Sequence, residues 1–114
     1  MFAWSLFNLC HLPMKPDHPI PSTAQTPRFA LGHVVSTPAV VAHFEAHSIN
    51  ALDYLGRHAS GDWGEVPPED AALNELALAQ NSRLLSRYTI AGKCVWLISE
   101  ADRSSTTFLF PDEY

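Results

Sequence analysis

The stretch that decides the fold is RLLSRYTIAGKCVWLISEADRSSTTFLF, residues 83–110. Three runs, 83–90, 93–100 and 106–110, have the period of two that is typical of β-strands. The short linkers between them carry glycine, aspartate and serine, which are the residues that form tight turns. The sequence therefore predicts a three-stranded antiparallel meander at the C-terminal end.

A short strand and a helix are expected before this meander. Residues 29–35, FALGHVV, are apolar and β-branched at their end, which favours a strand. Thr37 can cap a helix over 39–47, because Pro38 suits the first helical turn. This helix would bury one face made of Val40, Val41 and Phe44.

Two further helices are expected between 48 and 81. The first, 49–58, would be capped by Ser48 and would turn inward Ile49, Leu52 and Leu55. The second would begin at the proline pair 67–68, where acidic residues favour a helix start, and would end at Asn81. Its buried residues would be Leu73, Leu76 and Ala77.

The order β-α-α-α-β-β-β predicts an α+β fold with two or three helices on one face of the meander. The strand at 29–35 is a possible fourth strand at the sheet edge. This single domain would cover residues 29–114.

Residues 1–28 have a different composition. Six of the nine prolines lie before residue 39, so 13–28 is expected to be an extended or disordered arm. The apolar segment 1–12 lacks the basic residues and the cleavage site of a secretory signal. Two alternatives remain for it: translation starts at Met14, or the segment packs on the domain as an arm.

Composition excludes several classes of protein. The net charge of −5 disfavours a protein that holds nucleic acid by bulk positive charge. Only two cysteines are present, Cys10 and Cys94, so a disulfide framework is excluded. No apolar run is long enough to cross a membrane. We therefore expect a cytoplasmic protein with no membrane association.

The most unusual polar run is RHASGDWG, residues 57–64. His58 could act as a general acid or base, and Asp62, in a glycine loop, could orient its imidazole. In the alternative interpretation Asp62 bonds loop amides, Trp63 fills the edge of the core and His58 ends a helix.

A second polar run, SEADRSSTT, covers residues 99–107. Arg103 could bind a phosphate or carboxylate with help from hydroxyl groups. In the alternative interpretation this is a tight turn in which Asp102 bonds the backbone and Arg103 pairs with Glu100. The candidate anion-binding residues are Arg83, Arg103, Ser104 and Thr107.

Antiparallel pairing would bring the strand 83–90 next to 93–100, so the two runs could share a site. The candidate catalytic cluster is His58, Asp62, Arg83, Tyr88, Glu100 and Arg103. No metal site is expected, because His43 and His47 lack a third ligand. No cofactor is expected either, since the phosphate-binding loops GxxxxGK[ST] and GxGxxG are missing.

The patterns RHxxGDWG and EADRSxTTxLxPxEY resemble a family of short proteins of bacterial plasmids and integrative elements, usually called plasmid-related or hypothetical proteins. The resemblance covers about residues 30–114 and implies a role in a mobile element, without implying a reaction. The matching positions are Arg57, His58, Gly61, Asp62, Trp63, Gly64, Asp70, Asn74, Arg83, Ser86, Tyr88, Glu100, Asp102, Arg103, Ser104 and Thr107.

Three functions are compatible with these observations. The first is a small accessory protein of a mobile element that binds a host or element protein. The second is a compact, metal-independent RNase-like or nucleotide-modifying enzyme. In that enzyme His58 would move the proton, Arg83 and Arg103 would hold phosphate, and Tyr88 or Glu100 would be the second proton carrier. The third is a purely structural or regulatory domain. The sequence leaves open whether the protein is an enzyme.

Overall fold

The computed structural model describes residues 26–114 and confirms the α+β fold. The elements in chain order are β1 (His33–Ser36), α2 (Pro38–Ala46), α3 (Ala51–Ala59), α4 (Pro68–Gln80), β2 (Leu84–Ile90), β3 (Lys93–Ser99), β4 (Ser105–Leu109) and the short 3-10 helix η2 (Pro111–Glu113). The predictions for the N-terminal arm and for a start at Met14 concern mainly residues 1–25, which lie outside the described residues. No helix within 26–114 is both long and apolar enough to cross a membrane.

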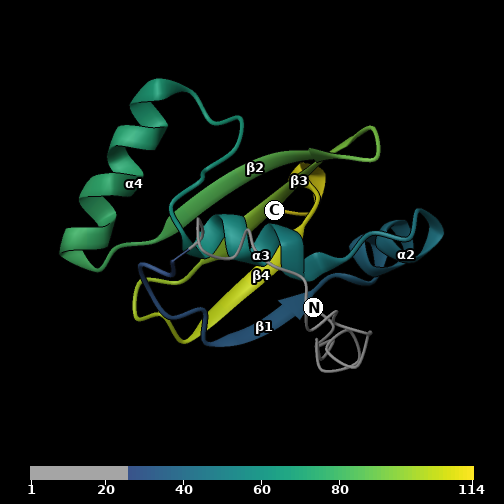
Figure 1. Cartoon of the computed structure of the whole chain (residues 1–114), viewed down its shortest axis with the longest axis horizontal. Coiled ribbons are helices and arrows are strands. Elements are labelled where there is room, and N and C mark those ends of the chain that lie inside the picture. The colour runs from purple at the N-terminus through teal and green to yellow at the C-terminus, as the bar shows by residue number, and fades with distance from the viewer. Residues whose placement is uncertain (1–25) are drawn as a thin grey trace.

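The four strands form one sheet in the order β1-β4-β3-β2 (Figure 1). β2, β3 and β4 are the predicted antiparallel meander. The N-terminal strand does join the sheet, and it pairs with β4 in parallel, with His33 opposite Ser105. It is shorter than expected, because Gly32 has a φ of 68° and turns the chain beside the 103–104 backbone.

The hairpin between β2 and β3 has the predicted position. Ile90 pairs with Lys93, and the two residues between them, Ala91 and Gly92, have φ values of 49° and 83°. Two residues with positive φ match the twist of the flanking strands, as in a type I′ turn.

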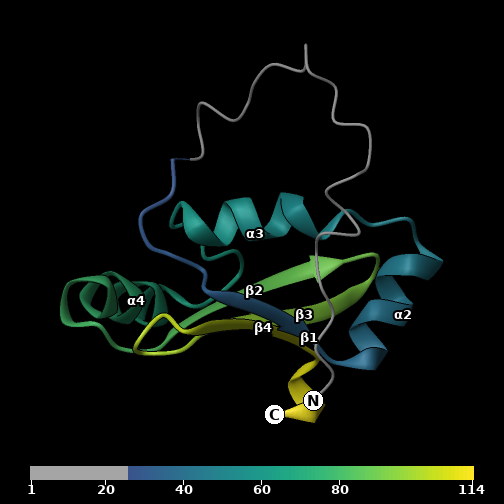
Figure 2. The same ribbon diagram turned by 90° about the horizontal axis from the view of Figure 1, so that it is seen from below.

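One face of the sheet carries the main core. Alternation along the strands turns Tyr88, Leu97 and Phe108 to this face, where all three are almost fully buried. α3 crosses this face (Figure 2) and contributes Leu55, while α2 contributes Phe44, whose ring lies edge-on to Phe108. Burial of each such side chain stabilises the fold by about 1.5–3 kcal/mol.

The start of α2 confirms its predicted cap, whereas that of α3 corrects the prediction. Thr37 Oγ1 accepts a hydrogen bond from the Val40 amide, 3.3 Å away, at the start of α2. Ser48 does not cap α3: its φ is 55°, and Asn50 accepts from the Leu52 amide instead. An asparagine two residues later meets the same need for a side-chain acceptor at the N-cap.

α4 begins at the proline pair, with Pro68 as its first residue, and ends with Asn81 as its C-cap, as predicted, but it turns a different face inward. Leu73 and Leu76 were expected in the core and are 62% and 50% exposed. Ala77 is buried as predicted, and Asn74 is the second buried residue of the helix. The cause is a hydrogen-bonded clamp: the Asn74 amide donates to the Leu85 carbonyl (2.7 Å) and accepts from the Leu85 amide (3.2 Å).

Candidate functional site

His58 lies in the last turn of α3 and points into the sheet, with none of its surface exposed. Its Nδ1 is 2.6 Å from the Ser86 hydroxyl in β2, and its Nε2 is 2.9 Å from the Ser99 hydroxyl in β3. The rings of Phe29 and Trp63 pack edge-on against the imidazole. The imidazole therefore joins two strands inside the core.

The hydrogen bonds of this network run in one direction. Thr106 donates to the Leu31 carbonyl (2.7 Å), because a carbonyl can only accept. Its single proton is then used, so Ser99 must donate to Thr106 (2.7 Å) and accept from His58 Nε2. Nδ1 of the neutral imidazole consequently accepts from Ser86. Every polar side-chain atom of this network of His58, Ser86, Ser99 and Thr106 has a partner.

The imidazole of His58 is held neutral. Burial, with a smaller contribution from the positive charge of Arg103, lowers the pKa of His58 from 6.5 to about 3. A catalytic histidine must touch its substrate and exchange a proton near the working pH. His58 meets neither requirement in this conformation.

Asp62 pairs with Arg57 and makes no contact with His58. Its carboxylate lies 2.7 Å from Arg57 Nε and also accepts from the Gly64 amide (3.1 Å), which is the predicted loop alternative. The Arg57 hydrogen bond lowers the pKa of Asp62. The Tyr88 hydroxyl donates to the Asp62 carbonyl (2.6 Å), so Tyr88 anchors the loop as well. Burial raises the pKa of the Tyr88 phenol.

Arg103 binds backbone carbonyl groups. Nη1 donates to the Ser82 carbonyl (2.6 Å) and the Glu100 carbonyl (2.8 Å), while Nη2 donates to the Ala77 carbonyl (3.1 Å). The Ala77 carbonyl is in the last turn of α4, where a cation is favourable. Arg103 thus joins the end of α4 to the turn between β3 and β4.

The turn itself has the predicted aspartate geometry. Asp102 accepts from the Ser104 amide (3.0 Å), and the hydrogen bonds from Ser104 lower the pKa of its carboxyl. Arg103 does not pair with the Glu100 side chain, which was the expected partner.

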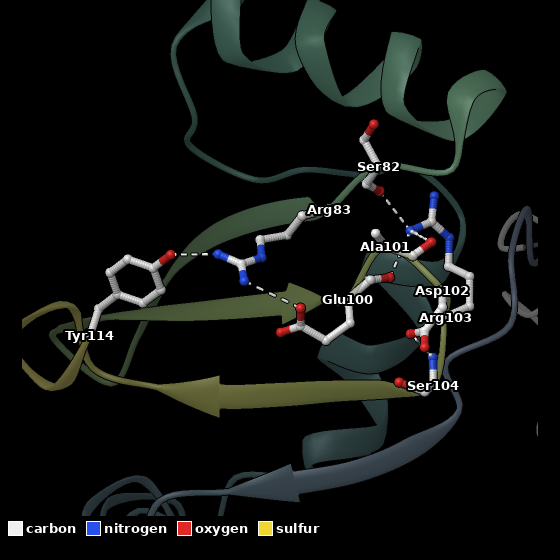
Figure 3. Close-up of polar contacts among 8 residues, drawn as sticks. All are labelled: Ser82, Arg83, Glu100, Ala101, Asp102, Arg103, Ser104 and Tyr114. Carbon is white, nitrogen blue, oxygen red and sulfur yellow. Dashed lines mark hydrogen bonds and ion pairs between the residues drawn. The ribbon is translucent and has the colours of Figure 1, made fainter.

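Glu100 pairs with Arg83 instead, on the opposite face of the sheet from His58. Arg83 Nη2 lies 3.3 Å from the Glu100 carboxylate, and Nη1 donates to the Tyr114 hydroxyl (2.6 Å). Figure 3 shows the guanidinium groups of Arg83 and Arg103 apart from each other, the first between Tyr114 and Glu100 and the second beside Ser82. Of the other anion-binding candidates, Ser104 is exposed in the turn and Thr107 is buried in β4.

The structure therefore distributes the six candidate residues over separate contacts. His58 is in the core, Asp62 and Tyr88 anchor the 60–64 loop, Arg103 closes the end of α4, and Arg83 and Glu100 form a partly exposed pair. Among residues 26–114 no group of three metal-binding side chains is present, and His43 Nε2 bonds the Ile90 carbonyl (2.8 Å).

Sequence reasoning missed Ser99 and Thr106 as partners of His58. The feature that could have identified them is a hydroxyl group at a strand position whose side chain, by alternation, faces the apolar core. It also missed Arg87 and Trp96, which alternation places on the other face, as described below.

No family model, curated protein or solved structure matches this chain.

Proposed function

We propose that the protein is a small accessory protein that acts by binding a protein partner rather than by catalysis. Two features support a binding role: the candidate catalytic residues do not converge, and His58 is closed off from solvent. The resemblance to proteins of plasmids and integrative elements favours a partner encoded by the host or by the element.

The observation that carries the proposal is the exposed apolar face of α4. Leu73 and Leu76 are the two most exposed leucines among the described residues, at 62% and 50%. They lie three residues apart and so share one helix face with two exposed alanines, 72 and 79. We call these four residues the α4 strip. Apolar side chains gathered on one helix face mark a surface for another protein.

The charge of α4 indicates the chemistry of the partner. The helix carries Glu69, Asp70 and Glu75 and no lysine or arginine, and the whole chain has a net charge of −5. Two copies of α4 facing each other would bring like charges together, which disfavours a homodimer through this strip. The complementary occupant is an amphipathic helix of another protein, with leucine-like side chains flanked by lysine or arginine.

The test is a quantitative binding assay. The tagged protein is used to capture partners from a host that carries the element, the dominant captured protein is purified, and its affinity and stoichiometry are measured by calorimetry. We expect one-to-one binding that weakens as salt is raised.

Matched variants connect this binding to the strip. The double variant Leu73→Gln and Leu76→Gln should weaken binding about a hundredfold or more, since two apolar contacts are lost. Ala46→Gln, at an exposed position of α2, is the control and should bind like the unchanged protein. Equal binding by the double variant and the control, or the lack of a stoichiometric partner, would contradict the proposal.

A further inference from the structure

Arg87 and Trp96 lie directly opposite each other in the β2–β3 register. Alternation turns both side chains to the face of the sheet that does not carry His58 and α3. Their positions on neighbouring strands bring the two side chains into contact range.

Arg87 differs from the other arginines of the described chain. Arg28, Arg57 and Arg83 each pair with a carboxylate, and Arg103 donates to backbone carbonyls. Arg87 forms no ion pair and no side-chain hydrogen bond with residues 26–114, and its Nε is buried without a partner. A buried charged N–H group without an acceptor is unfavourable, so a missing acceptor is indicated.

Trp96 has the same deficit. Its indole Nε1 is buried without a partner, whereas the indole of Trp63 donates to Glu75 (3.1 Å). The ring of Trp96 is held in place by Tyr114, whose ring lies edge-on at 5.6 Å between centroids. Two unpartnered N–H donors, one of them charged, therefore belong to side chains at opposed positions of neighbouring strands, on one face of the sheet.

The backbone of Arg87 is fixed on its outer side. Its amide donates to the Trp63 carbonyl (3.0 Å), and its carbonyl accepts from the Glu65 amide (2.7 Å). The carboxylate of Glu65 is engaged by the Thr89 hydroxyl (2.8 Å). The carboxylate of Glu100, which alternation places on the same face, is paired with Arg83. The side chain of Arg87 thus starts from a hydrogen-bonded backbone, and its guanidinium has no ion pair with a carboxylate of residues 26–114.

We propose that Arg87 and Trp96 form a binding site for an oxyanion, either a carboxylate or a phosphate group of a ligand. Arg87 Nε and a neighbouring Nη donate side by side to two oxygens, which is the geometry that both groups accept. The indole N–H of Trp96 donates to one of the same oxygens. This site lies away from the α4 strip and does not depend on the function proposed above.

The test follows the indole N–H signals by proton–nitrogen NMR while inorganic phosphate or acetate is added at constant ionic strength. The chain has three tryptophans, and Trp63, with its partner Glu75, is an internal control. Trp96→Phe identifies the Trp96 signal. We expect this signal to shift to a plateau with at least one anion, while the Trp63 signal stays in place. A plateau with phosphate alone assigns a phosphate ligand, and one with acetate as well assigns an oxyanion in general.

Arginine variants separate a site from a general charge effect. Arg87→Gln should raise the dissociation constant about tenfold or more, because a charged hydrogen-bonding group is lost. Arg83→Gln removes the same charge from the same face and should leave the dissociation constant nearly unchanged. Arg87→Lys, which keeps the charge, should bind more weakly than the unchanged protein. Shifts without a plateau for both anions, or equal weakening by the Arg83 and Arg87 variants, would overturn the proposal.

Discussion

The Nε2 of His58 and the Oγ of Ser99 lie 2.9 Å apart, and this contact joins the last turn of α3 to the end of β3. The Ser99 hydroxyl also donates a hydrogen bond to Thr106. Two buried polar groups therefore depend on a single hydroxyl.

Ser99→Ala should lower the free energy of unfolding by about 2–4 kcal/mol, since it leaves the buried His58 Nε2–H without an acceptor and removes the hydrogen bond to Thr106. Urea denaturation followed by circular dichroism measures this change. Ser82→Ala, at an exposed position where the hydrogen bonds are made by the backbone, is the control and should stay within about 0.5 kcal/mol of the unchanged protein. Similar stabilities of the two variants would argue against the network.

Acidification should destabilise the protein through His58. Its pKa falls from 6.5 to about 3 on folding, so between these values the unfolded chain binds a proton that the folded chain does not. Stability from this residue is complete above about pH 6.5 and decreases as the pH falls toward 3. Between about pH 7 and pH 4 the loss should be on the order of 3 kcal/mol.

The matched variant for this pH dependence is His58→Gln, which keeps one acceptor and one donor but does not titrate. Denaturation at a series of pH values should give a shallower loss in the variant than in the unchanged protein. Asp62 and the other carboxylates are present in both proteins and cancel in the difference. Parallel curves would contradict a buried neutral histidine.

Arg103→Gln should destabilise the protein by about 1.5–3 kcal/mol, because a shorter, uncharged side chain cannot reach the carbonyls at the end of α4 and in the turn. Arg83→Gln removes a partly exposed ion pair and should cost about 1 kcal/mol or less. Hydrogen exchange at the C-terminal turn of α4 should rise in the Arg103 variant alone. Equal rates of hydrogen exchange in the two variants would contradict a role of Arg103 in capping α4.

Gly64 and Gly92 form a second matched pair. Both have positive φ, 74° and 83°, so an alanine is strained at either position. At Gly64 an added Cβ would also collide with the Arg87 carbonyl and come within 2.7 Å of the Tyr88 ring, whereas at Gly92 it meets open space. Gly92→Ala should lower stability by about 1–2 kcal/mol, and Gly64→Ala by clearly more. Thermal melts of the two variants compare them directly.

Local patterns were sufficient for the meander. Alternation in 83–90 and 93–100 and the glycine at position 92 specify strands and turn within a few neighbouring residues. The same is true of the Thr37 cap and the end of α4. β1 and β4 are separated by three helices and two strands, so local periodicity contains no information about their parallel pairing.

The orientation of α4 could not be predicted from the spacing of its apolar residues. The pattern contains two candidate faces, and the leucine face is the more apolar. The bidentate hydrogen bond of Asn74 to the edge of β2 selects the other one. Asn74 and Leu85 lie in different elements, a helix and a strand. The spacing of apolar residues along α4 therefore does not predict their contact.

The polar residues were found, but their partners were not. His58 stands out in the sequence, yet Ser99 lies 41 residues away and enters its contact only through sheet pairing. Asp62 pairs with Arg57, which lies one turn of chain earlier in α3, rather than with His58, whose imidazole is bonded to Ser86 and Ser99 in the core.

The clamp of Asn74 on Leu85 has a consequence for association. β2 is an edge strand, and unpaired edges recruit further strands and lead to aggregation. Here Asn74 occupies both backbone groups of Leu85, while Trp63 and Glu65 occupy those of Arg87, so this edge offers little to an invading strand. α4, which presents Leu73 and Leu76 to solvent, thus also covers part of the edge of the sheet. Displacement of α4 would free the backbone groups of Leu85, while Trp63 and Glu65 would still cover those of Arg87.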